Sequence, residues 1–332
     1  MDKEKKANGY LHFFIGLITG VLILAVIGIY SSDKNPRENL KNGLASEGDD
    51  PVFRIVIPRI PDNLEFAGEK VPLQNFEVKE RVDREFLVNA YWYSSTILGM
   101  KRANRWFPVI EPILKKYGVP DDFKYMPVIE SNLYNSTSYA GAVGFWQLTE
   151  DVAKRYGLEI DDQVDERYNV EKSTEAACMY LLSADSLFHS WTLAAAAFNM
   201  GRRGLEKQIE KQGEHNYYNL LLSDQTSRYV ARLLAIKEIF THPHNFGFYI
   251  SKYELYPPLK TYEVKVNTPV ENWTDFAKSY DINYKILKYY NPWLRDVSLK
   301  NKKRITYEIE IPIKGSIDII DDDQESDTLS GF

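Results

Sequence analysis

The sequence predicts a mainly α-helical protein with a small α+β module close to its carboxyl end. From about residue 83 to residue 240, apolar residues recur at the spacing of amphipathic helices. Between residues 261 and 311, two strand-like stretches flank two short helical patterns. The 332 residues are enough for about two domains. We therefore expect a helical domain followed by a strand–helix–helix–strand module.

Composition and charge narrow the classes of function. The net charge of −6 argues against a nucleic-acid partner, which would need a basic face. The single cysteine, Cys178, lies in a helical pattern and is expected to be a buried apolar residue. The sequence contains neither HExxH nor CxxC. We therefore expect no metal and no cofactor.

The first 30 residues predict a cytoplasmic tip and a transmembrane anchor. The run from Leu11 to Tyr30 is uncharged, mostly apolar and long enough to span a bilayer. It follows Lys3, Lys5 and Lys6, which favour a cytoplasmic amino terminus and place the remaining chain outside. No good cleavage site follows, although a cleaved signal peptide is the alternative.

The next segment, residues 31–82, is interpreted as a linker and strap. Residues 31–50 are rich in polar residues and predict a flexible tether. Residues 51–82 contain short strand-like pieces interrupted by Pro58 and Pro61, which favours an extended strap along the main domain. At the other end of the chain, residues 316–332 form an acidic tail that is expected to be disordered.

Several helices are expected between residues 83 and 250. The segment Trp191–Met200 is nearly all apolar and contains four alanines, so it should be the buried central helix. The acidic segment Asp161–Tyr168 is expected to be a solvated loop. One more helix is expected to begin near residue 83, and another to follow Ser173 as its cap. The remaining predicted helices span Trp106–Tyr117, Thr149–Tyr156 and Thr226–Phe240.

Glu130 is the main candidate for a catalytic residue. Phe123, Met126, Pro127 and Glu130 recur at helical spacing, so Glu130 extends an apolar stripe. A carboxylate on such a face is costly unless it is paired, and burial raises its pKa. A general acid needs that protonated state near neutral pH. A paired structural carboxylate is the alternative interpretation.

The residues after Glu130 indicate carbohydrate chemistry. Ser131 follows directly, and Gly144 provides backbone freedom after a polar loop. Phe145, Trp146 and Gln147 then offer an aromatic stacking face and an amide. An acid, aromatic faces and amides are what a sugar site requires, because sugar rings carry C–H faces, hydroxyl groups and acetamido groups.

Together these segments resemble the lytic murein transglycosylases of the soluble-lytic and goose-type-lysozyme superfamily, especially the membrane-bound D-type branch. The resemblance covers about residues 83–240 and implies a lysozyme-like helical transglycosylase domain over residues 83–250. It also implies peptidoglycan glycan strands as the partner and an anchor in the bacterial inner membrane, with the domain in the periplasm. The matching motifs are Glu130-Ser131, Gly144-Phe145-Trp146-Gln147, Val164–Arg167 with Ser173–Ala177, Ala197-Phe198-Asn199, and Thr226–Val230.

The family resemblance implies a specific reaction. Glu130 would protonate the glycosidic oxygen between N-acetylmuramic acid and N-acetylglucosamine, and then take the proton of the muramoyl C6 hydroxyl as it attacks C1. The product is a 1,6-anhydromuramoyl end. The resemblance also implies the substrate-binding residues. Ser131 and Ser138 would orient Glu130 and substrate, whereas Gln147, Asn199 and Tyr229 would hold polar sugar groups, with Tyr229 facing Glu130. The other implied residues are Gly144, Phe145, Trp146 and Phe198.

Two other functions stay open. Phe198 stands where the family usually has tyrosine, and the loop at residues 135–138 is short and lacks the usual proline. Both departures leave open a catalytically weak glycan-binding or scaffold protein. A lysozyme-like hydrolase would need a second carboxylate. Asp165 and Glu166 are the candidates, and a solvated loop suits them better.

The carboxyl-terminal pattern resembles a LysM module over residues 258–315. Strands are expected at Thr261–Val266 and Ile305–Ile311, and helices at Glu271–Tyr280 and Asn283–Tyr290. The usual glycine-aspartate of the first turn is replaced by Asn267-Thr268-Pro269. Glycan binding and a purely structural role are both compatible with this module. The sequence identifies no protein partner.

Overall fold

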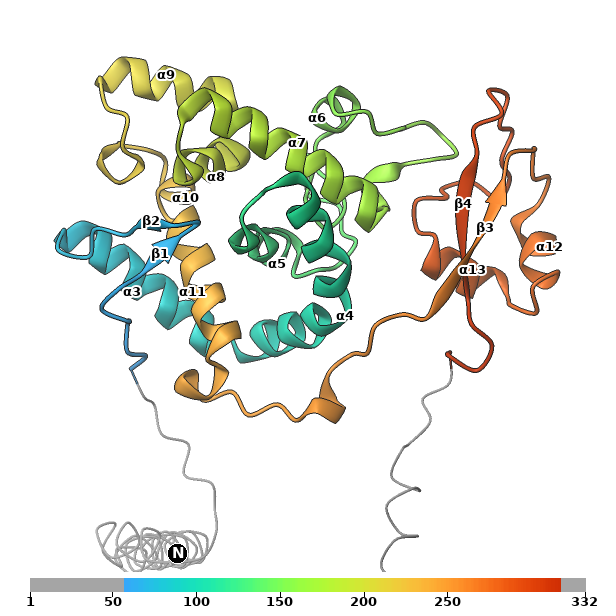
Figure 1. Ribbon diagram of the computed structural model, residues 1–332, viewed down its shortest axis with the longest axis horizontal. Helices are drawn as coiled ribbons and strands as arrows, with labels where there is room; N and C mark the ends of the chain where they lie inside the picture. Colours follow the sequence, from blue (N-terminus) through green and yellow to red (C-terminus); the bar gives the residue numbers. More distant parts are fainter. Residues whose placement is uncertain (1–56, 318–332) are drawn as a thin grey trace, which may run out of the picture. The chain divides into compact units, whose positions relative to one another are not determined.

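The computed structural model describes residues 57–317. The anchor predicted over residues 1–30, the first part of the predicted linker up to residue 56 and the tail from residue 318 lie outside the described residues. Within residues 57–317, no helix is both long and apolar enough to cross a bilayer. The described chain is mainly helical and carries a small β-containing module at its carboxyl end (Figure 1).

The helical part begins with a short hairpin, β1 (Glu65–Phe66) and β2 (Glu69–Lys70), and continues through helices of very different length. The short helical turns are η1 (Asp121–Tyr125), η2 (Glu166–Tyr168), η3 (Tyr217–Asn219), η4 (Pro243–Phe246) and η5 (Lys252–Glu254). The α-helices are α3 (Phe76–Tyr91), α4 (Tyr93–Tyr117), α5 (Met126–Ser131), α6 (Glu150–Arg155), α7 (Val170–Phe188), α8 (Trp191–Met200), α9 (Arg202–Gln212), α10 (Asp224–Ser227) and α11 (Tyr229–Thr241).

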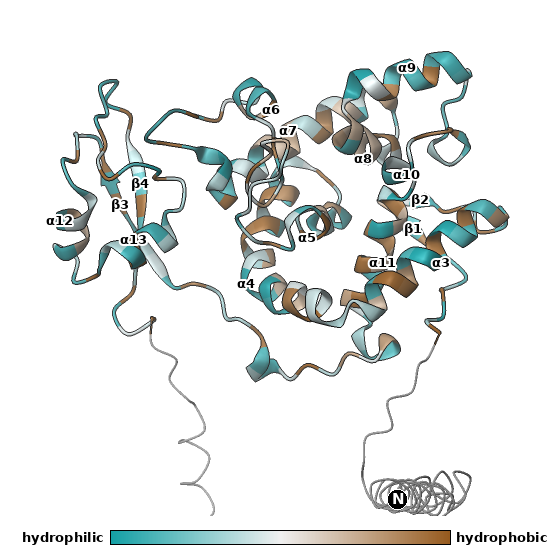
Figure 2. Ribbon diagram, turned by 180° about the vertical axis from the view of Figure 1, so that it is seen from behind, coloured by the Kyte–Doolittle hydropathy of each residue, from teal (hydrophilic) through white to brown (hydrophobic). Residues whose placement is uncertain are grey.

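Helix α8 lies in the core, as its apolar sequence predicts. Its residues from Thr192 to Ala197 are all buried, and the four alanines leave room for neighbouring helices to pack closely. Ser190 caps its amino terminus by accepting a hydrogen bond from the Leu193 amide. Glu69 of the hairpin adds a second cap, because its carboxylate accepts hydrogen bonds from the amides of Trp191 and Thr192. In Figure 2, α11 carries many hydrophobic residues, whereas α9 is mostly hydrophilic.

Four predicted helix boundaries are wrong. The helix predicted over Trp106–Tyr117 begins much earlier, because α4 spans Tyr93–Tyr117. The first helix begins at Phe76 instead of near residue 83, because Asn75 caps it within the segment interpreted as a strap. Helix α7 begins at Val170, where Asn169 is the cap, so Ser173 lies inside the helix. The helix predicted over Thr226–Phe240 is divided at Arg228 into α10 and α11. Asn75 and Asn169 set the starts of α3 and α7 by capping, which helical periodicity does not report.

The carboxyl-terminal module has the predicted order of elements. Strand β3 (Thr261–Val266) pairs antiparallel with β4 (Tyr307–Pro312), and α12 (Trp273–Lys278) and α13 (Tyr284–Tyr290) lie between them in the chain. Asn291 is buried, and its side chain bonds to both the amide and the carbonyl of Glu310. This contact ties the end of α13 to β4.

The segment predicted to be a solvated acidic loop is packed instead. Val164 belongs to the core of the carboxyl-terminal module, and the Asp165 amide donates to the Trp293 carbonyl at 2.9 Å. Asp165 and Glu166 are both buried. Buried carboxylates need partners, and here Asp165 pairs with Arg167 at 2.7 Å while Glu166 pairs with Lys172. The two carboxylates therefore have structural partners.

Candidate active site

Glu130 lies in the last turn of the short helix α5. That helix ends in two left-handed residues, Asn132 and Leu133, each with a φ of 53°. The Asn132 side-chain amide donates to the Ser95 carbonyl at 3.0 Å. A Cβ at Gly99 would lie 2.6 Å from the Asn132 side-chain oxygen, so α4 approaches closely at this point. These contacts hold the end of α5, and with it Glu130, against α4.

The Glu130 carboxyl accepts a hydrogen bond from the Tyr229 hydroxyl at 2.5 Å. Burial raises the pKa of Glu130 above its usual value, although the Tyr229 hydrogen bond and the positive charge of Arg232 act in the opposite direction. Tyr229 is the first residue of α11 and is itself buried. Its pKa is raised well above the usual value, mainly by burial, so its hydroxyl stays protonated and remains a donor.

A cavity of about 680 Å³ lies beside Glu130. Its walls come from α3, α5, α11 and the start of α4, and they include Arg84, Glu85, Glu130, Ser131 and Arg232. Glu130 is half-buried, as expected for a side chain in such a wall. The Glu130 side chain therefore borders a space that a ligand could occupy.

The loop after α5 depends on Gly144. Its φ is +81°, and a Cβ there would lie only 2.0 Å from the Arg167 carbonyl oxygen, so only glycine fits. The Ser131 hydroxyl donates to the Phe145 carbonyl at 2.9 Å, and the Ser138 hydroxyl accepts from the Ala142 amide at 3.0 Å. Both hydroxyls therefore shape this loop, and the expected role of the two serines in orienting Glu130 and substrate stays a prediction.

The aromatic residues of the Phe145–Gln147 segment do not form the expected stacking face. Trp146 is fully buried, and its indole nitrogen donates to the Thr174 hydroxyl at 2.8 Å. Phe145 is also buried and borders a different cavity of about 510 Å³. The side-chain nitrogen Nε2 of Gln147 donates to the Gly144 carbonyl at 2.8 Å, and thus stabilises the loop. The loop turns Phe145 and Trp146 inward, so both side chains are buried in the helical core.

Phe198 and Asn199 lie near the end of α8. Phe198 is half-buried and packs edge-on against Tyr180, with ring centroids 5.2 Å apart. The Asn199 side-chain oxygen accepts a hydrogen bond from the Thr226 hydroxyl at 2.9 Å and so links α8 to α10. Of the predicted substrate-binding residues, the structure brings Tyr229 into hydrogen-bond contact with Glu130, and Ser131 into the same cavity wall.

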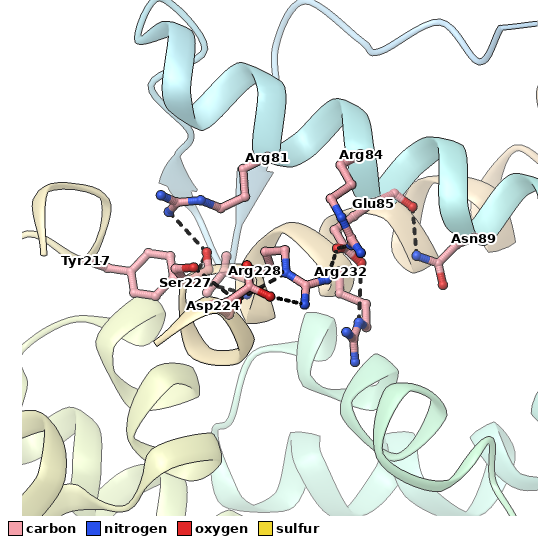
Figure 3. Close-up of polar contacts among 10 residues, drawn as sticks. Arg81, Arg84, Glu85, Asn89, Tyr217, Asp224, Ser227, Arg228 and Arg232 are labelled. Carbon is pink, nitrogen blue, oxygen red and sulfur yellow. Dashed lines mark hydrogen bonds and ion pairs between the residues drawn. The ribbon is translucent and has the colours of Figure 1, made fainter. Parts of the chain in front are cut away.

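Sequence reasoning missed a cluster of charges, drawn in Figure 3, whose members Arg84, Glu85, Arg228 and Arg232 line the same cavity as Glu130. Glu85 is buried on α3 and accepts from Arg228 Nη1 at 2.9 Å and from Arg232 Nε at 3.3 Å. Arg84 forms a third ion pair with the same carboxylate. The spacing of Arg228 and Arg232 places both on one face of the chain around α11, but Glu85 lies 143 residues before Arg228. Within residues 57–317, no group of three or more His, Cys, Asp or Glu side chains could hold a metal ion.

Two family models match segments of the chain. Residues 108–221 match the transglycosylase SLT domain, and residues 262–315 match the soluble lytic transglycosylase C-terminal LysM-like domain. The chain contains an SLT transglycosylase domain followed by a LysM-like domain. The SLT match includes Glu130 and the Gly144 loop but ends before Tyr229. The tyrosine that bonds to Glu130 is therefore located by the structure, beyond the matched segment.

The chain is homologous to membrane-bound lytic murein transglycosylase D of Escherichia coli (strain K12). The two are 26% identical over 191 residues, a region that covers 55% of this chain and 41% of the relative. The protein of the same name from E. coli O6:H1 matches equally well. A protein named for tributyltin chloride resistance in Alteromonas sp. (strain M-1) is 34% identical over 114 residues, which cover 33% of this chain and 55% of that protein.

Proposed function

We propose that this SLT and LysM-like chain is a peptidoglycan lytic transglycosylase in which Glu130 is the single general acid and base. It cleaves the β-1,4 bond between N-acetylmuramic acid and N-acetylglucosamine and leaves 1,6-anhydromuramoyl ends. The observation that carries this proposal is the half-buried Glu130, which borders a cavity of about 680 Å³ and has a raised pKa. The family matches over residues 108–221 and 262–315 support the same class of reaction.

The proposed reaction uses Glu130 twice. The protonated carboxyl first donates its proton to the glycosidic oxygen, and the bond from C1 to that oxygen breaks. The resulting carboxylate then accepts the proton of the muramoyl C6 hydroxyl, whose oxygen bonds to C1. The Tyr229 hydroxyl, 2.5 Å from Glu130, stabilises the carboxylate that exists between the two steps. The substrate provides its own nucleophile, so no water is consumed.

The other carboxylates near the site favour this route over hydrolysis. A glycoside hydrolase normally uses a second carboxylate as base or nucleophile. Glu85 borders the same cavity, but three arginines occupy its oxygens. Asp165 and Glu166, the candidates from the sequence, are buried in ion pairs with Arg167 and Lys172. Glu130 is thus the carboxyl group in this cavity that is available for proton transfer.

The proposal also places the protein at the cell wall. The apolar run from Leu11 to Tyr30 would anchor it in the bacterial inner membrane, with the SLT domain in the periplasm. The name of the E. coli relatives, membrane-bound lytic murein transglycosylase D, supports this location. Retention of the full chain in the membrane fraction after alkaline extraction is the expected result, and release into the soluble fraction would contradict the anchor.

The test is Glu130→Gln in the full chain, assayed on purified peptidoglycan with product analysis by mass spectrometry. The variant should lose at least about a hundredfold in cleavage rate, because the amide cannot donate or accept the proton. Binding to peptidoglycan should persist, since the side chain keeps its shape. The matched control is Glu150→Gln, an exposed glutamate of α6, which should cleave normally.

Three outcomes would contradict parts of the proposal. Cleavage by Glu130→Gln at the control rate would remove Glu130 from the mechanism. Reducing ends in place of anhydro ends, with the wild-type chain, would indicate a hydrolase. Binding without any cleavage by the wild-type chain would indicate a glycan-binding protein on the same fold, which the replacement of the family tyrosine by Phe198 favours.

A further inference from the structure

The arginines around Glu85 do not use their hydrogen-bond donors equally (Figure 3). Each guanidinium nitrogen of Arg228 makes a hydrogen bond, because Nε and Nη2 donate to Asp224 at 3.1 and 2.6 Å while Nη1 donates to Glu85. Arg232 gives Glu85 only Nε, and Arg84 gives it only Nη1. The remaining guanidinium nitrogens of Arg232 and Arg84 make no hydrogen bond to any residue between 57 and 317.

These free donors border the cavity of Glu130. Both Arg84 and Arg232 line its wall, and their side chains are 50% and 33% exposed. The buried Glu85 carboxylate holds both guanidinium groups in place, which lowers the entropy lost when a ligand binds. The cavity wall therefore presents positioned donors in addition to the proton donor Glu130.

The charges of the cluster favour an anion. Arg84, Arg228 and Arg232 contribute three positive charges, whereas Glu85 and Asp224 contribute two negative charges, which leaves an excess of one positive charge. A guanidinium group matches the planar oxygens of a carboxylate through two parallel hydrogen bonds. A neutral sugar hydroxyl could use one of these donors, but it would not neutralise the charge.

We propose that Arg232 and Arg84 form a subsite that binds a carboxylate carried by the muramoyl residue while Glu130 acts on the adjacent glycosidic bond. This inference rests on the proposed function. Two parts of peptidoglycan share the required chemistry. They are the lactyl carboxylate of a muramoyl residue that lacks its peptide, and a carboxylate of the attached peptide. A glycan made only of N-acetylglucosamine carries neither group, so the subsite distinguishes peptidoglycan from such a polymer.

The test measures binding by the full chain in detergent, in a Glu130→Gln background that prevents turnover. The probes are an alternating tetrasaccharide with free lactyl carboxylates, the same tetrasaccharide with attached peptides, and a tetramer of N-acetylglucosamine. Arg232→Gln should weaken at least one carboxylate-bearing probe about tenfold or more, since it removes a charge-assisted contact. The N-acetylglucosamine tetramer should bind as before. The affected probe identifies which carboxylate is recognised.

Two further variants make this test decisive. Arg84→Gln should weaken the same probe, by less because Arg84 is the more exposed. Arg203→Gln is the matched control, since Arg203 is an exposed residue of α9 remote from this cavity wall. Glu85 keeps Arg228 as a partner in both cavity variants, and thermal unfolding of each variant verifies the fold.

The subsite is refuted if Arg232→Gln and Arg84→Gln both bind the carboxylate probes as tightly as Arg203→Gln does. It is also refuted if the two variants weaken all three probes equally. Failure of the proposed function has a different signature, because the wild-type chain would then produce no anhydro ends whatever its arginines do. Carboxylate discrimination without anhydro products would support the subsite and reject the lyase.

Discussion

The pKa of the Glu130 carboxyl is subject to opposing influences. Burial favours its protonated form, whereas the Tyr229 hydrogen bond and the Arg232 charge favour the carboxylate. Burial is the largest influence, so the resting pKa is raised. Both forms are needed in the proposed reaction, and the surroundings of this side chain support each of them.

Tyr229→Phe should separate these influences. The substitution removes the hydrogen bond that lowers the pKa of Glu130, while burial persists, so the pKa should rise further. The proposed reaction begins with the protonated acid, so kcat/KM should fall as the pH rises through this pKa. In the variant that fall should occur at higher pH, and kcat should drop about tenfold because the carboxylate loses a donor.

The pH profile of kcat/KM is the measurement for this variant. Tyr218→Phe is the control, since Tyr218 is buried and its hydroxyl has no hydrogen-bond partner among the described residues. If Tyr229→Phe titrates at the wild-type pH or below, the Tyr229 contact does not control the protonation of Glu130.

Among the loops, the turn from Ser136 to Leu148 is stabilised by hydrogen bonds to its own backbone. The Gly144 backbone amide donates to the Ser136 carbonyl at 3.0 Å, and the side-chain nitrogen Nε2 of Gln147 donates to the same carbonyl at 3.1 Å. Ser131 connects this turn to α5, and Arg167 packs against Gly144. The loop thus joins the helix that carries Glu130 to the segment that contacts the LysM-like module.

Gly144→Ala should destabilise the protein by about 3 kcal/mol or more, because the new Cβ combines a strained φ with a clash against backbone. Urea denaturation measures the loss in the free energy of unfolding. Gly141→Ala is the control, since Gly141 has nearly the same φ of +80° but nothing within 4 Å of its Cβ position. It should cost only about 1–2 kcal/mol. Equal losses in the two variants would mean that the approach of Arg167 is not constraining.

For the described chain as a whole, the SLT and LysM-like domains are connected by direct contacts as well as by the chain segment between them. The segment around Gln163 and Val164 pairs with the LysM-like module, and the Arg295 amide donates to the Gln163 carbonyl at 2.8 Å. The Gln163 side chain bonds to Asp296 at 3.1 Å and to the Lys300 amide at 2.9 Å. One side chain therefore serves several contacts with the module.

Gln163→Ala should loosen this attachment and lower the free energy of unfolding by about 2 kcal/mol, since it removes several partly buried hydrogen bonds. Hydrogen exchange should accelerate at the Asp165 and Arg295 amides, which donate across this contact. Asp162→Ala is the control, because Asp162 is an exposed neighbour. Exchange at the control rate in Gln163→Ala would show that the backbone contacts alone hold the module.

Much of the fold could be predicted from local patterns. Helical periodicity identified α8 and the second half of α4, and strand alternation identified β3 with its observed bounds. These features depend on residues within a few positions of one another, so the sequence reports them directly. Glu130 was identified as the candidate acid for the same reason, because its apolar stripe is local.

The order of residues alone determined the helical class, the βααβ module and the apolar setting of Glu130. Only the tertiary structure decided that Trp146 is buried and that Asp165 and Glu166 are paired. The family resemblance implied that Tyr229 faces Glu130, and the structure supplies the hydrogen bond between them. It also brings Glu85 into contact with Arg228, which lies 143 residues later in the sequence. The physical reason is that burial and ion pairing depend on which elements meet in space, and helical or strand periodicity carries no information about that.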